Sequence, residues 1–445
     1  MPNPPAPAPP TRASRRFVWL AWAAIAAFGV FLALRTTSAA GGSDSSGYLN
    51  HARMLADGHS RVPLRLPPEL GAPGDQGTNH FVPLGFVAAA DPAAIVPTYP
   101  TGLPLHFALA ARIFGWDIGP KLVLVLAALA AVWLCYLAAR ELGLAPALAA
   151  AGAAMLAAFP VFLFCSIQAL SDTLATAWCL AAVLCALRAP RGGRWAAACG
   201  AAFSVAVLVR PTNVFLAPAL AVLLGAGFRR LAAFALAGLP AAAWQLLYNN
   251  HQYGGPFETG YGDFRSAFSL VYGWPTFLHF ARWLGAFLPP VALLLPFAAL
   301  AHPATRDRRL AGLGLAFALI AGFYLFYDVS HDVWWCLRFI LPVVPALILA
   351  ALLGVEALAR GPGARWPRAF RPVAAAALAA WAVAASWYWS PGLHVFMVQV
   401  YEQNYEDAAR LAARELPPDA LVAACLFSGS LYYYTDRAVL RSDVV

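Results

Sequence analysis

The hydrophobic positions of this chain fall into long, nearly uninterrupted runs, separated by short segments that contain arginine, glycine and proline. An α-helix needs about 20 apolar residues to cross the hydrocarbon core of a bilayer, which is about 30 Å thick. By this criterion the chain has eleven predicted membrane-spanning helices. They cover residues 17–36, 120–139, 146–165, 168–188, 194–209, 212–227, 231–249, 276–299, 310–328, 335–359 and 372–390. The pattern predicts an all-α polytopic membrane protein.

Composition and charge exclude other classes of protein. Hydrophobic residues make up 61% of the 445 residues and charged residues only 11%, against roughly 25% charged in soluble domains. This hydrophobicity excludes a disordered chain. The basic residues are scattered between the spans and form no patch with aromatics, so we expect no nucleic-acid partner. The seven cysteines lie mostly in apolar runs without a CxxC pair, which favours core packing over a disulfide framework or a metal site.

The arginines predict the orientation. Arg12, Arg15 and Arg16 precede the first span and should stay cytoplasmic. Eleven spans then place every short basic cluster on the same side. Of the acidic residues, only Glu141, Asp307 and Glu356 fall on that side, and the others lie outside or at the outer membrane edge. We therefore expect a multi-pass protein of the inner (plasma) membrane with its active site and C-terminus extracytoplasmic.

Three parts follow from this topology. Residues 1–16 are predicted to be a disordered cytoplasmic N-terminus, and residues 17–390 a transmembrane module with a large outer loop over 37–119. Residues 391–445 are a short outer segment, either naturally reduced or truncated, in which we expect a helix and then one or two strands. Residues 98–115 are apolar, but a crossing there would put all later arginine clusters outside. We predict an amphipathic or re-entrant helix on the outer face instead.

Two elements of the first outer loop are candidates for chemistry. Asp44 follows the first span closely and is either the N-cap of a helix beginning near Ser45 or a reactive carboxylate. The segment Tyr99-Pro100-Thr101-Gly102-Leu103-Pro104 forces a tight entry into the following helix. Taken alone, it is equally explained as a helix-start turn.

Together, these two elements after one N-terminal span resemble the GT-C superfamily of polytopic glycosyltransferases. The resemblance is to bacterial members related to protein O-mannosyltransferases and the lipid A aminoarabinose transferase. The acid of the first loop corresponds to Asp44, and the Tyr-Pro-Pro-Gly-like segment to residues 99–102. The helix after the acid carries Tyr48, Leu49, Ala52, Leu55 and Gly58. Three later motifs are also similar: Arg210-Pro211-Thr212, the Tyr, Asn and Gly positions of residues 248–261, and Arg338-Phe339-Ile340-Leu341-Pro342.

The resemblance implies a donor substrate in which a sugar is linked to a polyprenyl phosphate, whose polyprenyl tail lies in the bilayer. It implies no cofactor, and it leaves open whether a divalent metal is bound. Asp44 would be the general base of an inverting transfer. Arg338 is the first candidate to bind the phosphate and Arg210 the second, because a guanidinium presents two donors to two oxygens. Either arginine could instead reach toward lipid headgroups, and Arg338 could pair with Asp332. The remaining candidates for the substrate site are Asp172, Tyr99, Tyr48 and His331.

Some features depart from the family or leave alternatives open. Ser45 follows Asp44 where many members have a second acid, and Thr101 stands where the second proline is usual. Asp172 could be a helix cap or the partner of an outer arginine, and an outer-loop histidine is often simply solvated. The rival functions are a secondary transporter, for which no internal repeat is evident, and a non-catalytic envelope-assembly protein. The enzyme hypothesis requires Asp44, Arg338 and residues 98–104 to meet at one outer-face cavity that is open to lipid.

Overall fold

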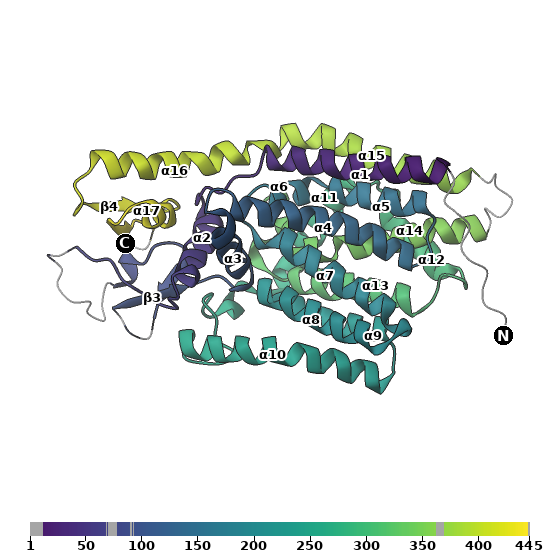
Figure 1. The fold of residues 1–445 in the computed structure, drawn as a ribbon, viewed down its shortest axis with the longest axis horizontal. Helices are drawn as coiled ribbons and strands as arrows, with labels where there is room; N and C mark the ends of the chain where they lie inside the picture. Colours follow the sequence, from purple (N-terminus) through teal and green to yellow (C-terminus); the bar gives the residue numbers. More distant parts are fainter. Residues whose placement is uncertain are drawn as a thin grey trace.

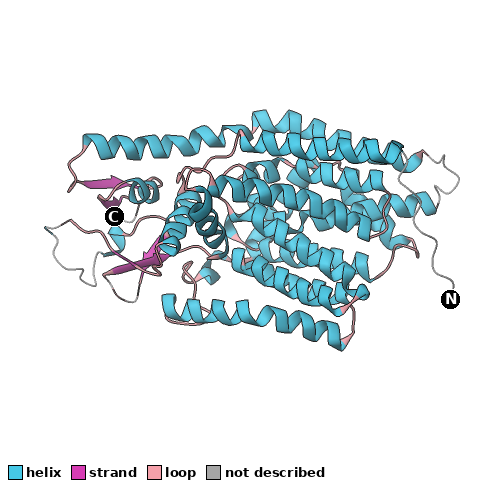
Figure 2. Cartoon of the chain, in the orientation of Figure 1, coloured by secondary structure: helices cyan, strands magenta, loops and turns pink. Residues whose placement is uncertain are grey.

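A computed structural model describes residues 12–67, 69, 78–89, 91, 93–361 and 369–443. Most of these residues form helices that run side by side along one axis, and the short strands gather at one end of this bundle (Figures 1 and 2). α1 (Arg12–Ala33) begins at the opposite end of the bundle (Figure 1). It includes residues 12–16, which we predicted to be disordered; residues 1–11 lie outside the described part of the chain.

Each predicted span coincides with helical structure. The bundle contains α1, α4 (Gly119–Glu141), α5 (Pro146–Ala157), α6 (Pro160–Ser166), α7 (Ser171–Arg188), α8 (Gly193–Val209), α9 (Ala217–Leu224), α10 (Phe228–Tyr253), α11 (Gly273–Phe287), α12 (Val291–Ala301), α13 (Arg308–Tyr324), α14 (Val344–Arg360) and α15 (Phe370–Gly392). Among the described residues, five helices are long and apolar enough to cross a membrane, or seven if two bent pairs each count as one span. The protein is thus a polytopic, largely helical chain, and the count of eleven crossings stays a prediction.

Two spans that we predicted as continuous are broken. The axis bends by 61° between α5 and α6, and by 98° between α11 and α12. In each break the residue before a proline has an extended backbone: Phe159 before Pro160 and Leu288 before Pro289. Proline disfavours a helical conformation in the preceding residue and has no N–H to continue the hydrogen-bond ladder. These prolines therefore end the first helix of each pair.

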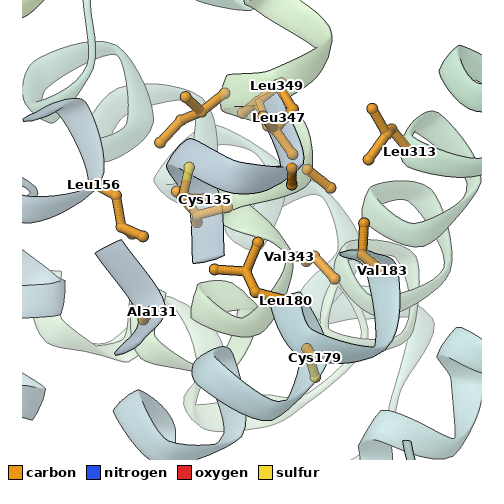
Figure 3. Packing of buried hydrophobic residues seen from close by; sticks show 14 of the residues in the cluster. Ala131, Cys135, Leu156, Cys179, Leu180, Val183, Leu313, Val343, Leu347 and Leu349 are labelled. Atoms are coloured by element: carbon orange, nitrogen blue, oxygen red, sulfur yellow. The ribbon is translucent and has the colours of Figure 1, made fainter. Parts of the chain in front are cut away.

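The core lies between α4, α7, α13 and α14, where side chains such as Cys135, Leu180 and Leu349 are shielded from solvent (Figure 3). Cys135 and Cys179 pack there as small apolar residues, as predicted. Close contact between α12 and α14 depends on Gly354, where an added Cβ would lie 2.0 Å from the carbonyl oxygen of Leu295. α10 contacts mainly α8 and leaves most of its apolar side chains exposed, as expected of a helix surrounded by lipid.

Acid–arginine pairs join helix ends at the strand-free end of the bundle. Glu141 accepts Arg188 at 3.1 Å and Arg191 at 2.6 Å. Glu356 accepts Arg360 at 2.7 Å and Arg371 at 2.8 Å. Two of the three acids that we assigned to the cytoplasmic side therefore sit among the arginines of that side.

The strand-bearing end is built from the first loop and the tail. α2 (Ser43–Ala56) and α3 (Gly102–Phe114) pack on each other, beside an antiparallel sheet ordered β1 (Val62–Pro63), β3 (Ala94–Pro97) and β2 (Phe86–Ala88). In the tail, α16 (Val398–Glu415) is followed by the parallel strands β4 (Leu421–Ala424) and β5 (Ala438–Arg441). The predicted helix and strands of the tail are confirmed. The short helix α17 (Ser428–Tyr434), which we did not predict, connects the strands and packs on α2.

Candidate active site

Asp44 lies in the first turn of α2 and does not cap it. The N-cap position is Gly42, and no side chain of this segment caps the helix. Instead, Oδ2 of Asp44 accepts Nη1 of Arg338 at 2.7 Å. The alternative that Asp44 is merely a helix cap is therefore wrong.

Arg338 reaches this position from a 3-10 helix, η8 (Trp334–Val343), which leads directly into α14. Its guanidinium lies over the rings of Trp335 and Phe339, 5.2 and 5.5 Å from their centroids. Such stacking orients a planar cation and shields it from water. Nη1 is also 3.9 Å from Oδ2 of Asp172. Arg338 thus pairs with these two carboxylates rather than with Asp332, which is exposed.

Asp172 and Arg210 form the second pair. Asp172 lies in the first turn of α7 with its side chain only 3% exposed, and its Oδ1 accepts Nη1 of Arg210. Arg210 has an extended backbone after α8, as expected for a residue before a proline. Its other arm donates to the hydroxyl of Tyr324 at 3.4 Å, and this hydroxyl also bonds Thr212 at 2.9 Å. The predicted pairing of Asp172 with an outer arginine is confirmed.

Two acids and two arginines therefore form one compensated cluster, which we call the charge cluster: Asp44, Asp172, Arg210 and Arg338. Burial of an unpaired charge would be costly, so each member stabilises its neighbours. Within this cluster, Nε of Arg338 is buried and has no hydrogen-bond partner. A buried donor that lacks a partner marks a place where a ligand oxygen can bind.

Two tyrosines line the Asp44 side of the cluster. The Tyr99 hydroxyl lies 2.9 Å from the Ser43 hydroxyl, and its ring packs on Tyr48 with centroids 4.8 Å apart. Tyr48 donates to the Ser171 hydroxyl at 3.0 Å, next to Asp172. The two tyrosines thus connect α2 to the first turn of α7.

Glycines allow this close approach. A Cβ on Gly47 would lie 2.3 Å from the Tyr99 ring. A Cβ on Gly102 would lie 2.3 Å from the backbone nitrogen of Val209, the residue before Arg210. Residues 99–102 therefore pack α3 closely against the end of α8, in addition to forming the turn at the start of α3. Asp44, Arg338 and this segment meet at the strand-bearing end of the bundle, and the shared cavity open to lipid stays a prediction.

The surroundings keep Asp44 ionised. Burial raises the pKa of this carboxyl, but the charge and hydrogen bond of Arg338 and a hydrogen bond from Tyr99 together hold its pKa below the ordinary value of 3.8. Burial and the nearby Asp44 charge raise the pKa of Tyr99. Asp44 is thus an acceptor-only carboxylate and Tyr99 a neutral hydroxyl donor at neutral pH.

The histidines do not join the charge cluster. Nδ1 of His331 is 3.4 Å from the Thr276 hydroxyl, and its ring packs against Tyr272, on the α11 side. His51 is buried in α2, with Nε2 3.3 Å from the Tyr248 hydroxyl. Burial lowers the pKa of His51 to about 3, so its ring is neutral. This histidine is therefore not one of the solvated outer-loop histidines that the sequence allowed. The described contacts of His331 thus lie with α11 and the residue before it, and its role at the substrate site stays a prediction.

The sequence did not indicate several neighbours of the cluster. Ser43, Ser171 and Tyr324 bind site residues through hydroxyl groups that look like ordinary polar positions in the sequence. Tyr261, in the loop after α10, packs edge-on against Tyr99 with centroids 6.0 Å apart. In the described part of the chain, no group of three or more His, Cys, Asp or Glu side chains is placed to hold a metal ion.

Sequence comparison gives a partial family match. Residues 100–247 match the family model of dolichyl-phosphate-mannose-protein mannosyltransferase. This segment runs from Pro100 into α10, and it includes Asp172 and Arg210. No curated protein matches the chain as a whole.

Solved structures match over nearly the whole chain. ArnT from Cupriavidus metallidurans bound to undecaprenyl phosphate aligns with a TM-score of 0.59 at 15% identity, over 96% of this chain and 85% of ArnT. The Archaeoglobus fulgidus oligosaccharyltransferase tethered with an acceptor peptide aligns with a TM-score of 0.55 at 13% identity, over 94% of this chain and 64% of that one. The mycobacterial arabinofuranosyltransferase AftD aligns with a TM-score of 0.53 at 16% identity, over 96% and 33%. In its fold, and over residues 100–247 in its sequence, the chain thus has the predicted resemblance to the GT-C superfamily of membrane glycosyltransferases.

Proposed function

We propose that the protein is an inverting glycosyltransferase that moves a sugar from a polyprenyl-phosphate donor to an acceptor on the outer face of the plasma membrane. The observation that carries the proposal is the charge cluster with its free Arg338 Nε–H. A buried cation with an unused donor suits an anionic headgroup, and the neighbouring carboxylate suits a general base.

The donor phosphate is assigned to Arg338. One oxygen would accept Nε–H and a second would accept Nη2–H, the two donors on one edge of the guanidinium, while Nη1 bonds Asp44. Arg210 stays with Asp172 and Tyr324 and contributes positive charge from behind. Undecaprenyl phosphate is bound in the ArnT structure that resembles this chain, which supports the same class of lipid here.

An apolar surface for the polyprenyl tail lies beside Arg210. Phe215 packs on Phe323 at 4.6 Å between centroids, and Phe323 packs on Tyr324, the partner of Arg210, at 5.1 Å. Phe215 is 37% exposed and Val214 49% exposed. A lipid whose phosphate bonds the charge cluster could therefore place its first isoprene units on these side chains.

In the proposed reaction, Asp44 accepts the proton of the acceptor hydroxyl. The acceptor oxygen then attacks the anomeric carbon from the face opposite the phosphate, and the bond between that carbon and the phosphate oxygen breaks. The departing polyprenyl phosphate keeps the electron pair, and Arg338 stabilises its negative charge. When the phosphate binds Arg338, its negative charge offsets the positive charge that lowers the pKa of Asp44, so Asp44 becomes a stronger base. Donor binding would thus activate the base.

The test is turnover by the purified protein in lipid nanodiscs. A panel of polyprenyl-phosphate sugars is incubated with the protein and with hydroxyl-bearing acceptors of protein, glycan and lipid type. We expect one donor to be consumed, and Asp44→Asn to abolish its consumption while the protein still folds. Transport of a donor without cleavage, or full turnover by Asp44→Asn, would refute the proposal.

A further inference from the structure

The tail packs directly on the segment that leads into α2, the helix of the proposed base. The backbone N–H of Ala40 donates to the Tyr434 hydroxyl at 2.9 Å. The Ser430 hydroxyl donates to the carbonyl oxygen of Gly41. This segment is therefore held by the C-terminal part of the chain as well as by the bundle.

Glu402 of α16 also contacts this segment. Its side chain is almost completely buried, and Oε1 accepts the backbone N–H of Gly42 at 3.3 Å. A Cβ on Gly41 would lie 2.5 Å from Oε2 and 2.9 Å from the Cα of Glu402. Burial raises the pKa of Glu402, and the charge of Asp44 adds to this increase. The absence of a side chain at Gly41 is thus what lets this carboxylate reach the start of α2.

The start of α2 has no cap of its own. The first backbone N–H groups of a helix lack partners within the helix and need an acceptor from elsewhere. Ser43 would be an ordinary source, but its hydroxyl bonds Tyr99, and Asp44 bonds Arg338. Negative charge at this end is also favoured by the helix dipole. The carboxyl group of Glu402 supplies the acceptor oxygen for the Gly42 N–H.

We propose that Glu402 is a positioning residue, which caps α2 from the tail and so holds Asp44 against Arg338. The inference rests on the proposed function, because its catalytic consequence depends on Asp44 acting as the base. It assigns the tail a role in the active site that neither its sequence nor its small size indicates.

The experiment compares Glu402→Ala, Glu402→Gln and the exposed control Glu415→Gln. Hydrogen exchange of residues 42–47, measured by mass spectrometry, should be roughly fivefold faster in Glu402→Ala, as expected for a lost helix cap. We expect kcat to fall at least tenfold while KM for the donor does not rise, because Arg338 still binds the phosphate. Glu402→Gln keeps an acceptor oxygen and should recover most of both properties, and the control should match the wild type.

Unchanged exchange at residues 42–47 together with unchanged kcat in Glu402→Ala would overturn the inference. If Glu402→Ala does not fold, Gly41→Ala tests the same contact, since its Cβ must displace the carboxylate. The exchange measurement needs no turnover. A failure of the proposed function would therefore appear as an inactive wild type with a normal capping effect, and a failure of the inference as an active wild type without one.

Discussion

Asp44→Asn should strengthen the binding of polyprenyl phosphate while it abolishes turnover. Asp44 and an incoming phosphate compete for the positive charge of one guanidinium, because Nη1 of Arg338 is already bonded to Oδ2 at 2.7 Å. Asparagine has nearly the same shape but no charge. The substitution thus weakens the competing bond and also removes the repulsion between Asp44 and the phosphate.

The size of the effect follows from the exposure of the pair. The side chains are 15% exposed for Arg338 and 28% exposed for Asp44, so the pair is partly screened by water. A hydrogen bond to a charged group contributes about 1.5–3 kcal/mol, and we take about 2 kcal/mol here. Since 1.4 kcal/mol corresponds to a tenfold change, the dissociation constant should fall by about 10- to 30-fold.

The assay is titration of the protein in nanodiscs with undecaprenyl phosphate, by calorimetry or fluorescence. Asp419→Asn, which removes an exposed acid of the tail, is the matched control and should bind like the wild type. Arg338→Gln should bind at least tenfold more weakly. Equal or weaker binding by a folded Asp44→Asn protein would refute the competition between Asp44 and the phosphate.

Three further predictions test the surroundings of the site. Tyr99→Phe removes a hydrogen bond that lowers the pKa of Asp44, so the acid limb of the pH–rate profile should move to higher pH. If the acid limb does not move, Tyr99 does not donate this hydrogen bond to Asp44. Since the folded-state pKa of Asp44 lies below 3.8, its stabilising effect is complete above that pH and lost as the pH falls through the folded value. Thermal unfolding of Asp44→Asn should lack this acid-dependent loss. Gly102→Ala should lower the free energy of unfolding by about 1–3 kcal/mol, because its Cβ meets the Val209 backbone. Gly314→Ala, with open space around its Cβ, should not destabilise the protein, and equal melting temperatures for these two variants would contradict the packing.

The sequence was informative about the members of the charge cluster because ionisable groups next to apolar spans are costly. Asp172, Arg210 and Arg338 each stand at the start or end of a long apolar run, where a charge needs a partner or a function. The choice of partner could not be predicted. Arg338 has Asp332 nearby in sequence, yet it pairs with Asp44 of the first loop. That choice depends on how the bundle brings helix ends together, which hydrophobic periodicity does not encode.

Glu402 and the helix breaks show two other limits of sequence analysis. Glu402 lies in an amphipathic helix beside Glu406, and the same pattern fits two solvated acids. Only the packing of α16 on the segment before α2 distinguishes them. The prolines at 160 and 289 are visible in the sequence, but a proline in a membrane helix can either bend it or be accommodated by its neighbours. The 61° and 98° bends were therefore missed.

The two ion pairs of the charge cluster differ in when they can form during synthesis. Asp172 and Arg210 are only 38 residues apart and lie at the same end of the neighbouring helices α7 and α8. They can pair as soon as these helices have inserted, which limits the time that either charge spends unpaired near lipid. Asp44 must wait until η8 and α14 deliver Arg338, and Glu402 arrives later still. The pairing of Asp44, the proposed base, is thus completed by parts of the chain that are made later, so a polypeptide arrested partway through biogenesis is left without an assembled charge cluster.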